Sequence, residues 1–384
     1  MSHIPYGRQE VTDEDVAAVT AVLRSDWLTQ GPVVPRFERA LADDCGATHA
    51  LAVNSATSAL HIACMALGLG PGDWLWTSPI TFLASANCAL YCGAQVDFVD
   101  IDPRTYNLSV SALSAKLAQA RAAGRLPKIV VPVHLAGQSC EMEAIHALGR
   151  EYGFRIIEDA SHAVGGRYQG RPVGDCRYSD ITVFSFHPVK IITSAEGGMA
   201  LTNDAQLAER MALARSHGMT RDAALMDHTP DGPWYYEQVA LGYNYRLTEL
   251  QAALGLSQAA RLHAYVARRH EIAQRYDALL EGLPLTRPWQ HPDSYSGLHL
   301  YVVRVAAERR RAVFEALRAA DIGVNVHYIP VHTQPVHQRP GEVRGPFPEA
   351  ERYYAEAISL PMYATLSDEQ QDRVVAVLRQ ALLG

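Results

Sequence analysis

The sequence predicts an α/β protein built on a mostly parallel, seven-stranded sheet flanked by helices, with a smaller C-terminal α+β domain. Short apolar segments alternate with amphipathic helical segments from residue 50 to 202, an order typical of parallel sheets with helical crossovers. From residue 246 the pattern changes to long helical segments followed by two further strand candidates. A chain of 384 residues also exceeds what one compact core usually holds, so we expect two domains.

The sheet is expected to form from seven apolar segments of strand length, at 50–53, 74–78, 96–99, 129–133, 155–158, 181–186 and 198–202. Helices are expected at 12–25, 57–68, 82–92, 109–121 and 141–152. Thr12 can cap the first of these helices, because an acidic residue follows three positions later. The alternation predicts helices on both faces of the sheet.

The chain beyond the sheet has a different character. Residues 246–281 have a helical pattern without proline, which predicts one or two long helices. After them we expect strands at 298–305 and 323–328 and helices at 307–320, 347–357 and 367–382. These elements divide the chain into a large domain, residues 1–250, and a small domain, residues 251–384, joined through a long helix.

The composition predicts a soluble protein of a reducing compartment. A formal net charge of −7 with scattered basic residues argues against general nucleic-acid binding. No segment approaches the roughly 20 apolar residues of a membrane span, and the first residues contain no apolar signal core. The six cysteines form no C-x-x-C pair, and Cys88 and Cys92 are expected to pack in the core. We therefore expect a cytoplasmic protein without nucleic-acid or membrane partners.

Lys190 is the strongest candidate for a chemically active residue. It is one of three lysines in a chain that otherwise uses arginine, and it follows the apolar segment 181–186. A desolvated lysine amine can act as a nucleophile or a base, whereas an arginine guanidinium stays protonated. Ligands of open α/β sheets bind beyond the carboxyl ends of the strands. The alternative is a solvated surface cation, which is the usual state of a lysine.

Three other segments could each hold part of one ligand, although each has a simpler explanation. Residues 54–60 mark the end of a strand and the start of a helix, which makes either a phosphate seat or a plain helix cap. Asp159 ends an apolar strand candidate and needs a cationic partner there, unless it caps a helix or forms an ion pair. Phe82 could stack on a flat ring or pack in the core.

Taken together, these residues describe a pocket for pyridoxal 5′-phosphate (PLP). Such a pocket needs a lysine that bonds to the cofactor aldehyde, a carboxylate at the protonated ring nitrogen and a helix end at the phosphate. Burial and the adjacent cationic ring would lower the pKa of the lysine amine, which could then move protons as general base and acid.

These motifs, in this order, resemble those of the DegT/DnrJ/StrS sugar-nucleotide aminotransferases, which belong to the fold-type I class of PLP enzymes. The resemblance extends from Tyr6 to residue 365 and includes the segment 242–249. It implies Lys190 as the catalytic residue and covalent anchor of PLP, with pyridoxamine 5′-phosphate (PMP) as the aminated intermediate. The cofactor-binding residues that it implies are Ala56, Thr57, Phe82, Asp159, His162, Ser185, Lys190 and Asn244.

The resemblance also implies a homodimer with shared active sites. In the family, the asparagine at the position of Asn244 reaches the phosphate in the partner subunit. The alternative for Asn244 is a helix cap.

The lysine segment, FSFHPVKIITSAEGG, resembles the branch of the family that aminates C4 of a keto sugar. The implied acceptor is UDP-2-acetamido-2,6-dideoxy-β-L-arabino-hex-4-ulose, a UDP-4-keto sugar of pseudaminic acid biosynthesis, and the implied donor is L-glutamate. The implied substrate-binding residues are Tyr6, Asp26, Trp27, Leu28, Thr29, His187, Asn325, Val326, His327 and Tyr328, so residues 1–34 contribute to the active site. A carboxylate at Asp26 would repel a diphosphate, so backbone contacts are expected around it.

Other functions remain open from the sequence. The acceptor could be a UDP-4-keto-pentose or a dTDP-4-keto-6-deoxyhexose, and a regulatory or binding protein could keep the fold without turnover. Related dehydratases of this fold have a histidine in place of the lysine, so Lys190 argues against them. A metal site at His327, His332 and His337 is not expected, because no acidic or thiol ligand accompanies them.

Overall fold

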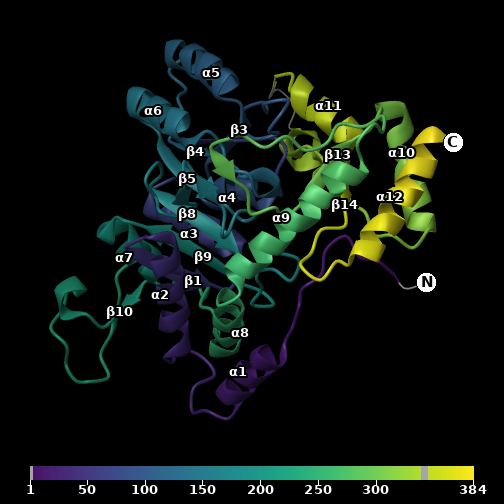
Figure 1. Ribbon diagram of the computed structural model, residues 1–384. Coiled ribbons are helices and arrows are strands. Elements are labelled where there is room, and N and C mark those ends of the chain that lie inside the picture. The colour runs from purple at the N-terminus through teal and green to yellow at the C-terminus, as the bar shows by residue number, and fades with distance from the viewer. Residues whose placement is uncertain (1–2, 339–344) are drawn as a thin grey trace.

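A seven-stranded sheet lies at the centre of the computed structural model, which describes residues 3–338 and 345–384 (Figure 1). Its strands are β1 (His49–Val53), β2 (Trp74–Thr77), β3 (Gln95–Phe98), β4 (Ile129–Val131), β5 (Arg155–Asp159), β8 (Ile181–Ser185) and β9 (Gly198–Thr202). Their spatial order is β1-β9-β8-β5-β4-β2-β3, and β9 alone of the seven runs opposite to the other six. The prediction of a mostly parallel, seven-stranded α/β sheet is confirmed.

Helices pack on both faces of this sheet. They are α2 (Val33–Cys45), α3 (Ala56–Ala66), α4 (Ala84–Tyr91), α5 (Val110–Ala122), α6 (Met142–Tyr152) and α7 (Ala205–Arg215). The first helix, α1 (Asp13–Leu23), packs instead against α8 (Glu249–Ala259). Alternate strand residues point to opposite faces. Leu51 and Val53 of β1 therefore pack with α3, α4 and α7, whereas Ala52 packs with α2. In β5, Ile157 joins the first of these cores and Ile156 packs with α5 and α6.

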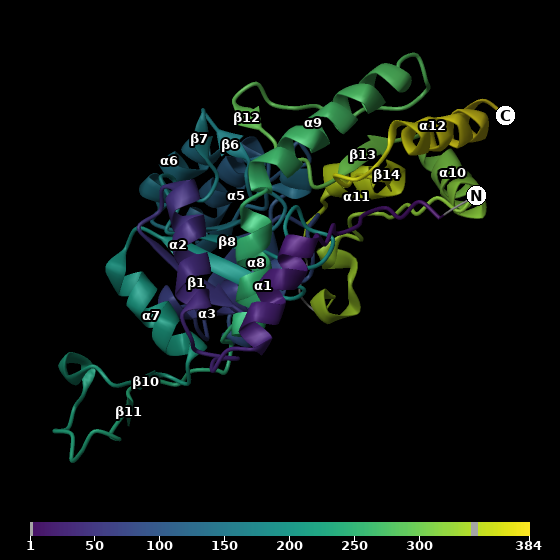
Figure 2. The ribbon, with the colours of Figure 1, turned by 60° about the horizontal axis from the view of Figure 1, so that its bottom comes forward.

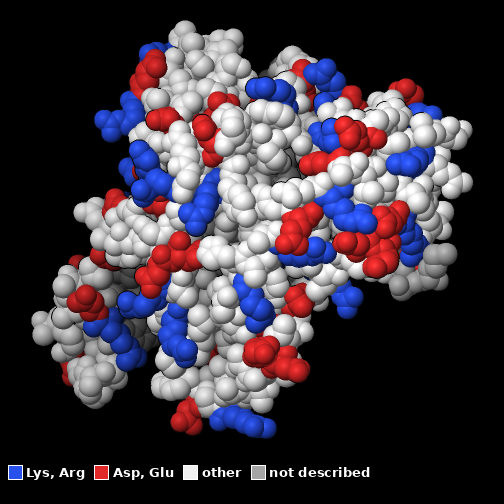
Figure 3. Space-filling model, in the orientation of Figure 1, with Lys and Arg blue, Asp and Glu red and all other residues white. Residues whose placement is uncertain are grey.

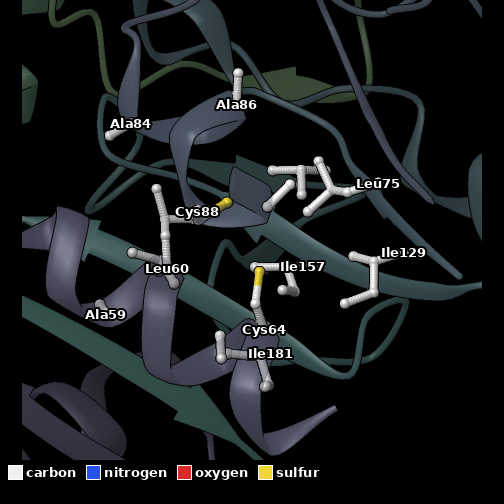
Figure 4. Close-up of a cluster of buried hydrophobic side chains, with 14 of the residues drawn as sticks. Ala59, Leu60, Cys64, Leu75, Ala84, Ala86, Cys88, Ile129, Ile157 and Ile181 are labelled. Carbon is white, nitrogen blue, oxygen red and sulfur yellow. The ribbon is translucent and has the colours of Figure 1, made fainter. Parts of the chain in front are cut away.

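Cysteines fill part of the core between α3 and α4. Cys64 and Cys88 are fully buried in a cluster that includes Leu60 and Ile157 (Figure 4). Cys92 is half-buried and packs against the same cluster. Free thiols of this kind behave as small apolar groups, as expected for Cys88 and Cys92.

Helix α2 is missing from the sequence-based prediction, as is α7. In α2, the buried side chains of Val34 and Phe37 do recur at helical spacing, but no side chain next to the helix caps its start. Instead, the buried carboxylate of Glu249 accepts hydrogen bonds from the backbone N–H groups of Val33 (2.6 Å) and Val34 (3.2 Å). The cap comes from 216 positions away, so no local signal marks the start of the helix.

The C-terminal part begins with α8 (Glu249–Ala259) and α9 (Leu262–Leu279), the long helices predicted from residues 246–281. It continues with β13 (Tyr301–Arg304), α10 (Ala307–Ala319), α11 (Pro348–Glu356), β14 (Ala357–Leu360) and α12 (Asp368–Leu383). The predicted strand at 323–328 is wrong. Ile322, just before this segment, forms an isolated bridge to Ile4, and Asn325 forms an isolated bridge to Ser359. Because the two bridges go to different segments, no continuous strand pairing forms. The domain boundary at residue 250 stays a prediction.

Short strands complete the structure. β6 (Arg167–Tyr168), β7 (Arg171–Pro172) and β12 (Ser294–Tyr295) form one small sheet, and β10 (Met219–Thr220) pairs with β11 (Glu237–Gln238). The segment between β10 and β11 extends away from the body of the protein (Figure 2). Residues 219–241, called the arm below, expose the apolar side chains of Trp234, Tyr236 and Leu241.

Acidic and basic side chains are interspersed on the face shown in Figure 3. This face therefore has no extended field of one sign. None of the helices within residues 3–338 and 345–384 is long and apolar enough to cross a membrane.

Candidate active site

Lys190 lies in the turn that follows β8. Its backbone N–H donates to the carbonyl oxygen of His187 (2.9 Å). The side chain is half-buried, and its amine has no hydrogen-bonding or ion-pairing partner within the described part of the chain. Burial lowers the pKa of Lys190 to about 8, although the negative charge of Asp159 opposes this shift. Lys190 is therefore not an ordinary solvated cation, because its amine loses a proton far more readily.

Asp159 ends β5 as a carboxylate that is only 5% exposed. The hydroxyl of Ser85, in the first turn of α4, donates to its Oδ2 (2.6 Å), and the backbone N–H of Ser161 donates to its Oδ1 (3.1 Å). No ion pair of Asp159 is found among the residues that the structure describes, so the alternative of a structural ion pair is not observed. A buried carboxylate without a cation is costly, which suits a bound cationic group.

His162 is held as a neutral imidazole. The backbone N–H of Ala136 donates to its Nδ1 (3.2 Å), so the proton lies on Nε2, which donates to the hydroxyl of Tyr328 (3.0 Å). Burial, together with the positive charge of Lys190, lowers the pKa of His162 well below its usual value. Ala136 adopts a left-handed conformation (φ 59°), a cost that is common where a loop must aim a group at a site.

His327 is also neutral and lies close to Lys190 and His162. Lys190, Asp159, His162, His327 and Tyr328 are called the cluster below. The side-chain amide of Asn325 donates to its Nε2 (3.3 Å), and its Nδ1–H donates to the hydroxyl of Ser359 (2.8 Å). Burial and the charge of Lys190 lower the pKa of His327 to about 3. The ring of Tyr6 lies 5.5 Å from the imidazole, measured between centroids, so the N-terminal segment reaches the site.

The N-terminus of α3 provides a seat for an anion. Ser55 caps the helix, because its hydroxyl accepts a hydrogen bond from the backbone of the first turn (3.1 Å). The backbone N–H groups of Ala56 and Thr57 at this end have no intrahelical acceptor. A Cβ on Gly198 would lie 2.5 Å from the nitrogen of Ala56, so only glycine allows this approach. Ser185 pairs with Gly198 across β8 and β9 and therefore borders the same helix end.

Phe82 does not pack in the core. Its side chain is 58% exposed, and its ring centroid lies 6.2 Å from that of Tyr328. The core-packing alternative is therefore wrong, and an exposed aromatic ring beside the cluster suits contact with a planar ligand.

Asn244 lies apart from this cluster. It is exposed and bridges to Ser216, and no described contact joins it to Lys190 of the same chain. Thr248, not Asn244, caps α8. The helix-cap alternative for Asn244 is therefore wrong.

The predicted segment 26–29 also lies near the start of α8, where Thr29 bridges to Thr248. Its side chains are exposed, including Trp27 and Leu28. Of the other predicted substrate residues, His187 is exposed in the turn before Lys190. Val326 is half-buried, and its backbone N–H donates to the side chain of Asn325 (2.8 Å).

Three residues around the cluster are absent from the sequence-based prediction. They are Ser85, Ala136 and His299. His299 is 3% exposed, and its ring centroid lies 4.4 Å from that of His162. Ser85 could have been found, because it lies one helical turn after Phe82. Ala136 and His299 meet His162 only through tertiary packing, which leaves no local signal.

The chain is similar along almost its whole length to known proteins. A family model described as the DegT/DnrJ/EryC1/StrS aminotransferase family matches residues 9–379. The spore coat polysaccharide biosynthesis protein SpsC of Bacillus subtilis is 40% identical over 388 residues, which cover 99% of this chain and 97% of SpsC. Helicobacter pylori PseC, an aminotransferase involved in the biosynthesis of pseudoaminic acid, is 34% identical, with a TM-score of 0.91 and 99% of each chain covered.

Spr1654 from Streptococcus pneumoniae is similar in both its PLP form and its PMP form. The PLP form is 28% identical (TM-score 0.88), with 99% of this chain and 98% of Spr1654 covered. The PMP form is 29% identical (TM-score 0.89), with 98% of each chain covered. The residues of this chain fit the PLP of these relatives. The buried, cation-free carboxylate of Asp159 suits its ring nitrogen, the open helix end beside Gly198 suits its phosphate, and Lys190 suits its aldehyde.

Proposed function

Because the chain belongs to the DegT/DnrJ/EryC1/StrS aminotransferase family, we propose that it transfers the amino group of L-glutamate to C4 of a UDP-linked 4-keto-6-deoxy-N-acetylhexosamine. The acceptor proposed is UDP-2-acetamido-2,6-dideoxy-β-L-arabino-hex-4-ulose, as in pseudaminic acid biosynthesis. The single observation that carries the proposal is the lysine amine of Lys190, with its lowered pKa, close to the cation-free carboxylate of Asp159. The lysine segment supports amination at C4. The similarity to PseC, an aminotransferase involved in the biosynthesis of pseudoaminic acid, supports the proposed acceptor.

When bound, PLP supplies an electrophilic carbon and a ring that accepts electrons once its nitrogen is protonated. In the proposal, Lys190 anchors the cofactor and, when released, takes a proton from Cα of the donor. The same amine then gives a proton to C4 of the acceptor. A pKa of about 8 suits both tasks, because the amine is easily charged and easily discharged near neutral pH.

The other residues bind and orient. We assign Asp159 to the ring nitrogen and neutral His162 to the ring hydroxyl. The phosphate is assigned to the backbone N–H groups of Ala56 and Thr57 and to the hydroxyl of Ser185. Phe82 would cover the ring and keep water from it.

The acceptor is assigned to a wall of uncharged polar side chains near Lys190. These are Tyr6, Asn325, His327 and Tyr328. His327 stays neutral because both its ring nitrogens are engaged in hydrogen bonds and its pKa is about 3. It would therefore act by hydrogen bonding and shape.

We propose a homodimer in which Asn244 and segment 26–29 complete the partner's active site. Both lie near the start of α8, are exposed, and have no described contact with Lys190 of their own chain. The arm supports this proposal, because its exposed Trp234 and Leu241 form apolar surface that a second copy would cover.

Mixing two inactive variants tests the shared site. A subunit with Lys190→Arg still supplies Asn244, and a subunit with Asn244→Ala still supplies Lys190. Mixing them under exchange should restore activity in hybrid dimers, whereas no recovery would refute the shared site.

The six free cysteines suit action in a reducing cytoplasm.

A different acceptor has specific support, because the identity to SpsC (40%) exceeds that to PseC (34%). The alternatives are a UDP-4-keto-pentose, a dTDP-4-keto-6-deoxyhexose or another 4-keto nucleotide sugar of a surface polysaccharide. Ranking kcat/KM over a panel of such sugars tests the acceptor. The proposal predicts the highest value for the UDP-linked N-acetylhexosulose, and a preference for a pentose or a dTDP sugar would refute it. A non-catalytic protein would leave glutamate unchanged with every sugar.

A further inference from the structure

One short hydrogen bond ties the first turn of α4 to the end of β5, and a second one orients its donor. Ser85 Oγ donates to Asp159 Oδ2 (2.6 Å), and the hydroxyl of Thr81 lies 2.7 Å from Ser85 Oγ. Thr81, Ser85 and Asp159 are all buried. A carboxylate only accepts and Ser85 has one hydroxyl proton, so that proton points to Asp159 and Thr81 donates to Ser85. The order is therefore Thr81 to Ser85 to Asp159.

Helix α4 itself has no need of the Ser85 hydroxyl. Serine near a helix start often serves as a cap, but the N-cap residue here is Leu83, and no side chain caps the helix. The hydroxyl also lies 3.3 Å from the carbonyl oxygen of Phe82, which is a longer contact and a weaker acceptor than the carboxylate. The hydroxyl of Ser85 is therefore directed at Asp159.

We propose that Ser85, oriented by Thr81, is a positioning residue that holds the carboxylate of Asp159 for the ring nitrogen of PLP. This inference rests on the proposed role of Asp159. A donor on Oδ2 restricts rotation of the carboxylate and favours its charged form, which alone can keep a ring nitrogen protonated. The backbone N–H of Ser161 restrains Oδ1 in the same way. Phe82 belongs to the same turn, so one turn of chain supports the ring nitrogen and flanks the ring.

PLP binding to the apo-protein tests the proposal without activity as the readout. Apo-protein is titrated with PLP, and the Kd is read from cofactor absorbance. Ser85→Ala should raise the Kd about tenfold to one-hundredfold, because a hydrogen bond to a charged group contributes about that much to an equilibrium constant. Ser85→Thr keeps the hydroxyl and should bind PLP nearly as well as wild type. The pH at which the cofactor band changes should also shift in Ser85→Ala alone.

Ser179→Ala is the matched control. Ser179 Oγ donates to Oε1 of Glu158 (2.5 Å), a buried carboxylate adjacent in sequence on the same strand, whose side chain points to the other face. Its removal deletes the same chemical contact without touching Asp159, so the Kd for PLP should stay unchanged. Thermal unfolding of each apo-variant verifies that it is folded.

Asp159→Asn distinguishes a failure of the positioning role of Ser85 from a failure of the role proposed for Asp159. If Asp159→Asn weakens PLP binding while Ser85→Ala binds like wild type, the positioning role of Ser85 is wrong and the role of Asp159 stands. If Asp159→Asn also binds like wild type, the role of Asp159 fails and the inference fails with it.

Should Ser85→Ala not fold, Thr81→Val removes the orienting hydroxyl at almost constant volume. It should raise the Kd less than tenfold, and an unchanged Kd would overturn the inference.

Discussion

The hydroxyl of Tyr328 lies 3.0 Å from Nε2 of His162, a contact between residues 166 positions apart. It joins the C-terminal part of the chain to the loop that follows β5 and Asp159. Because Nδ1 of His162 already accepts from the backbone of Ala136, Nε2 must be the donor in this contact. This hydrogen bond is therefore one of the contacts through which the two parts of the chain meet at the candidate site.

Tyr328→Phe should remove the acceptor of the buried Nε2–H of His162 and leave that group unpaired. We expect the free energy of unfolding of the apo-protein to fall by about 1–3 kcal/mol, measured by urea denaturation. Tyr236→Phe, in the exposed arm, is the control and should change nothing measurable. Equal stability of the two variants would show that the contact is not made.

Lys190→Arg should abolish covalent attachment of PLP, because a guanidinium keeps its charge but cannot bond to the aldehyde. Borohydride reduction followed by peptide mass analysis should show the cofactor mass on the peptide that contains Lys190 in wild type and no such adduct in the variant. Lys128→Arg is the control, because Lys128 forms an ion pair with Asp73 and should leave attachment intact. A retained adduct in Lys190→Arg would place the anchor elsewhere.

The rate of PLP attachment to the apo-protein should rise with pH, with a midpoint near 8. Burial lowers the pKa of Lys190 from its ordinary value of 10.5 to about 8, so the reactive neutral amine dominates above pH 8. Stopped-flow absorbance over a pH series measures this midpoint. A midpoint close to 10 would mean that the amine is solvated as an ordinary lysine.

Phe82→Ala should weaken PLP binding without destabilising the apo-protein. The side chain is 58% exposed, so its loss should change the free energy of unfolding by no more than about 0.5 kcal/mol. A ring contact contributes about 0.5–1.5 kcal/mol, so the Kd for PLP should rise about two- to tenfold. Leu383→Ala, similarly exposed, is the control and should leave the Kd unchanged. An unchanged Kd in Phe82→Ala would remove Phe82 from the cofactor site.

The sheet could be predicted from the sequence because strands such as β8 and β9 are buried on both faces and appear as short apolar runs. The start of α2 could not, because its cap is the carboxylate of Glu249, which reaches it only after folding. The predicted strand at 323–328 has strand composition, but its neighbours on the two sides are different segments. The apolar composition of a segment is a local property of the sequence, whereas its pairing partners are set by the fold.

The candidate site could likewise be predicted only in part. Lys190 and Asp159 could be identified because each lies at or just after the end of an apolar segment, where burial makes a charged group costly. The hydrogen bond between His162 and Tyr328 and the packing of His299 could not, because they depend on loops that meet only in the fold. The roles of Asn244 and segment 26–29 stay predictions that depend on a partner subunit.

Transfer of labelled nitrogen tests the central claim most directly. The purified enzyme, loaded with PLP, is incubated with ¹⁵N-glutamate and UDP-2-acetamido-2,6-dideoxy-β-L-arabino-hex-4-ulose, and the product is analysed by mass spectrometry and NMR. The account predicts one ¹⁵N atom bonded to C4 of the sugar, formed together with 2-oxoglutarate and lost in Lys190→Arg. An unlabelled sugar, a label at another carbon, or equal labelling in Lys190→Arg would contradict it.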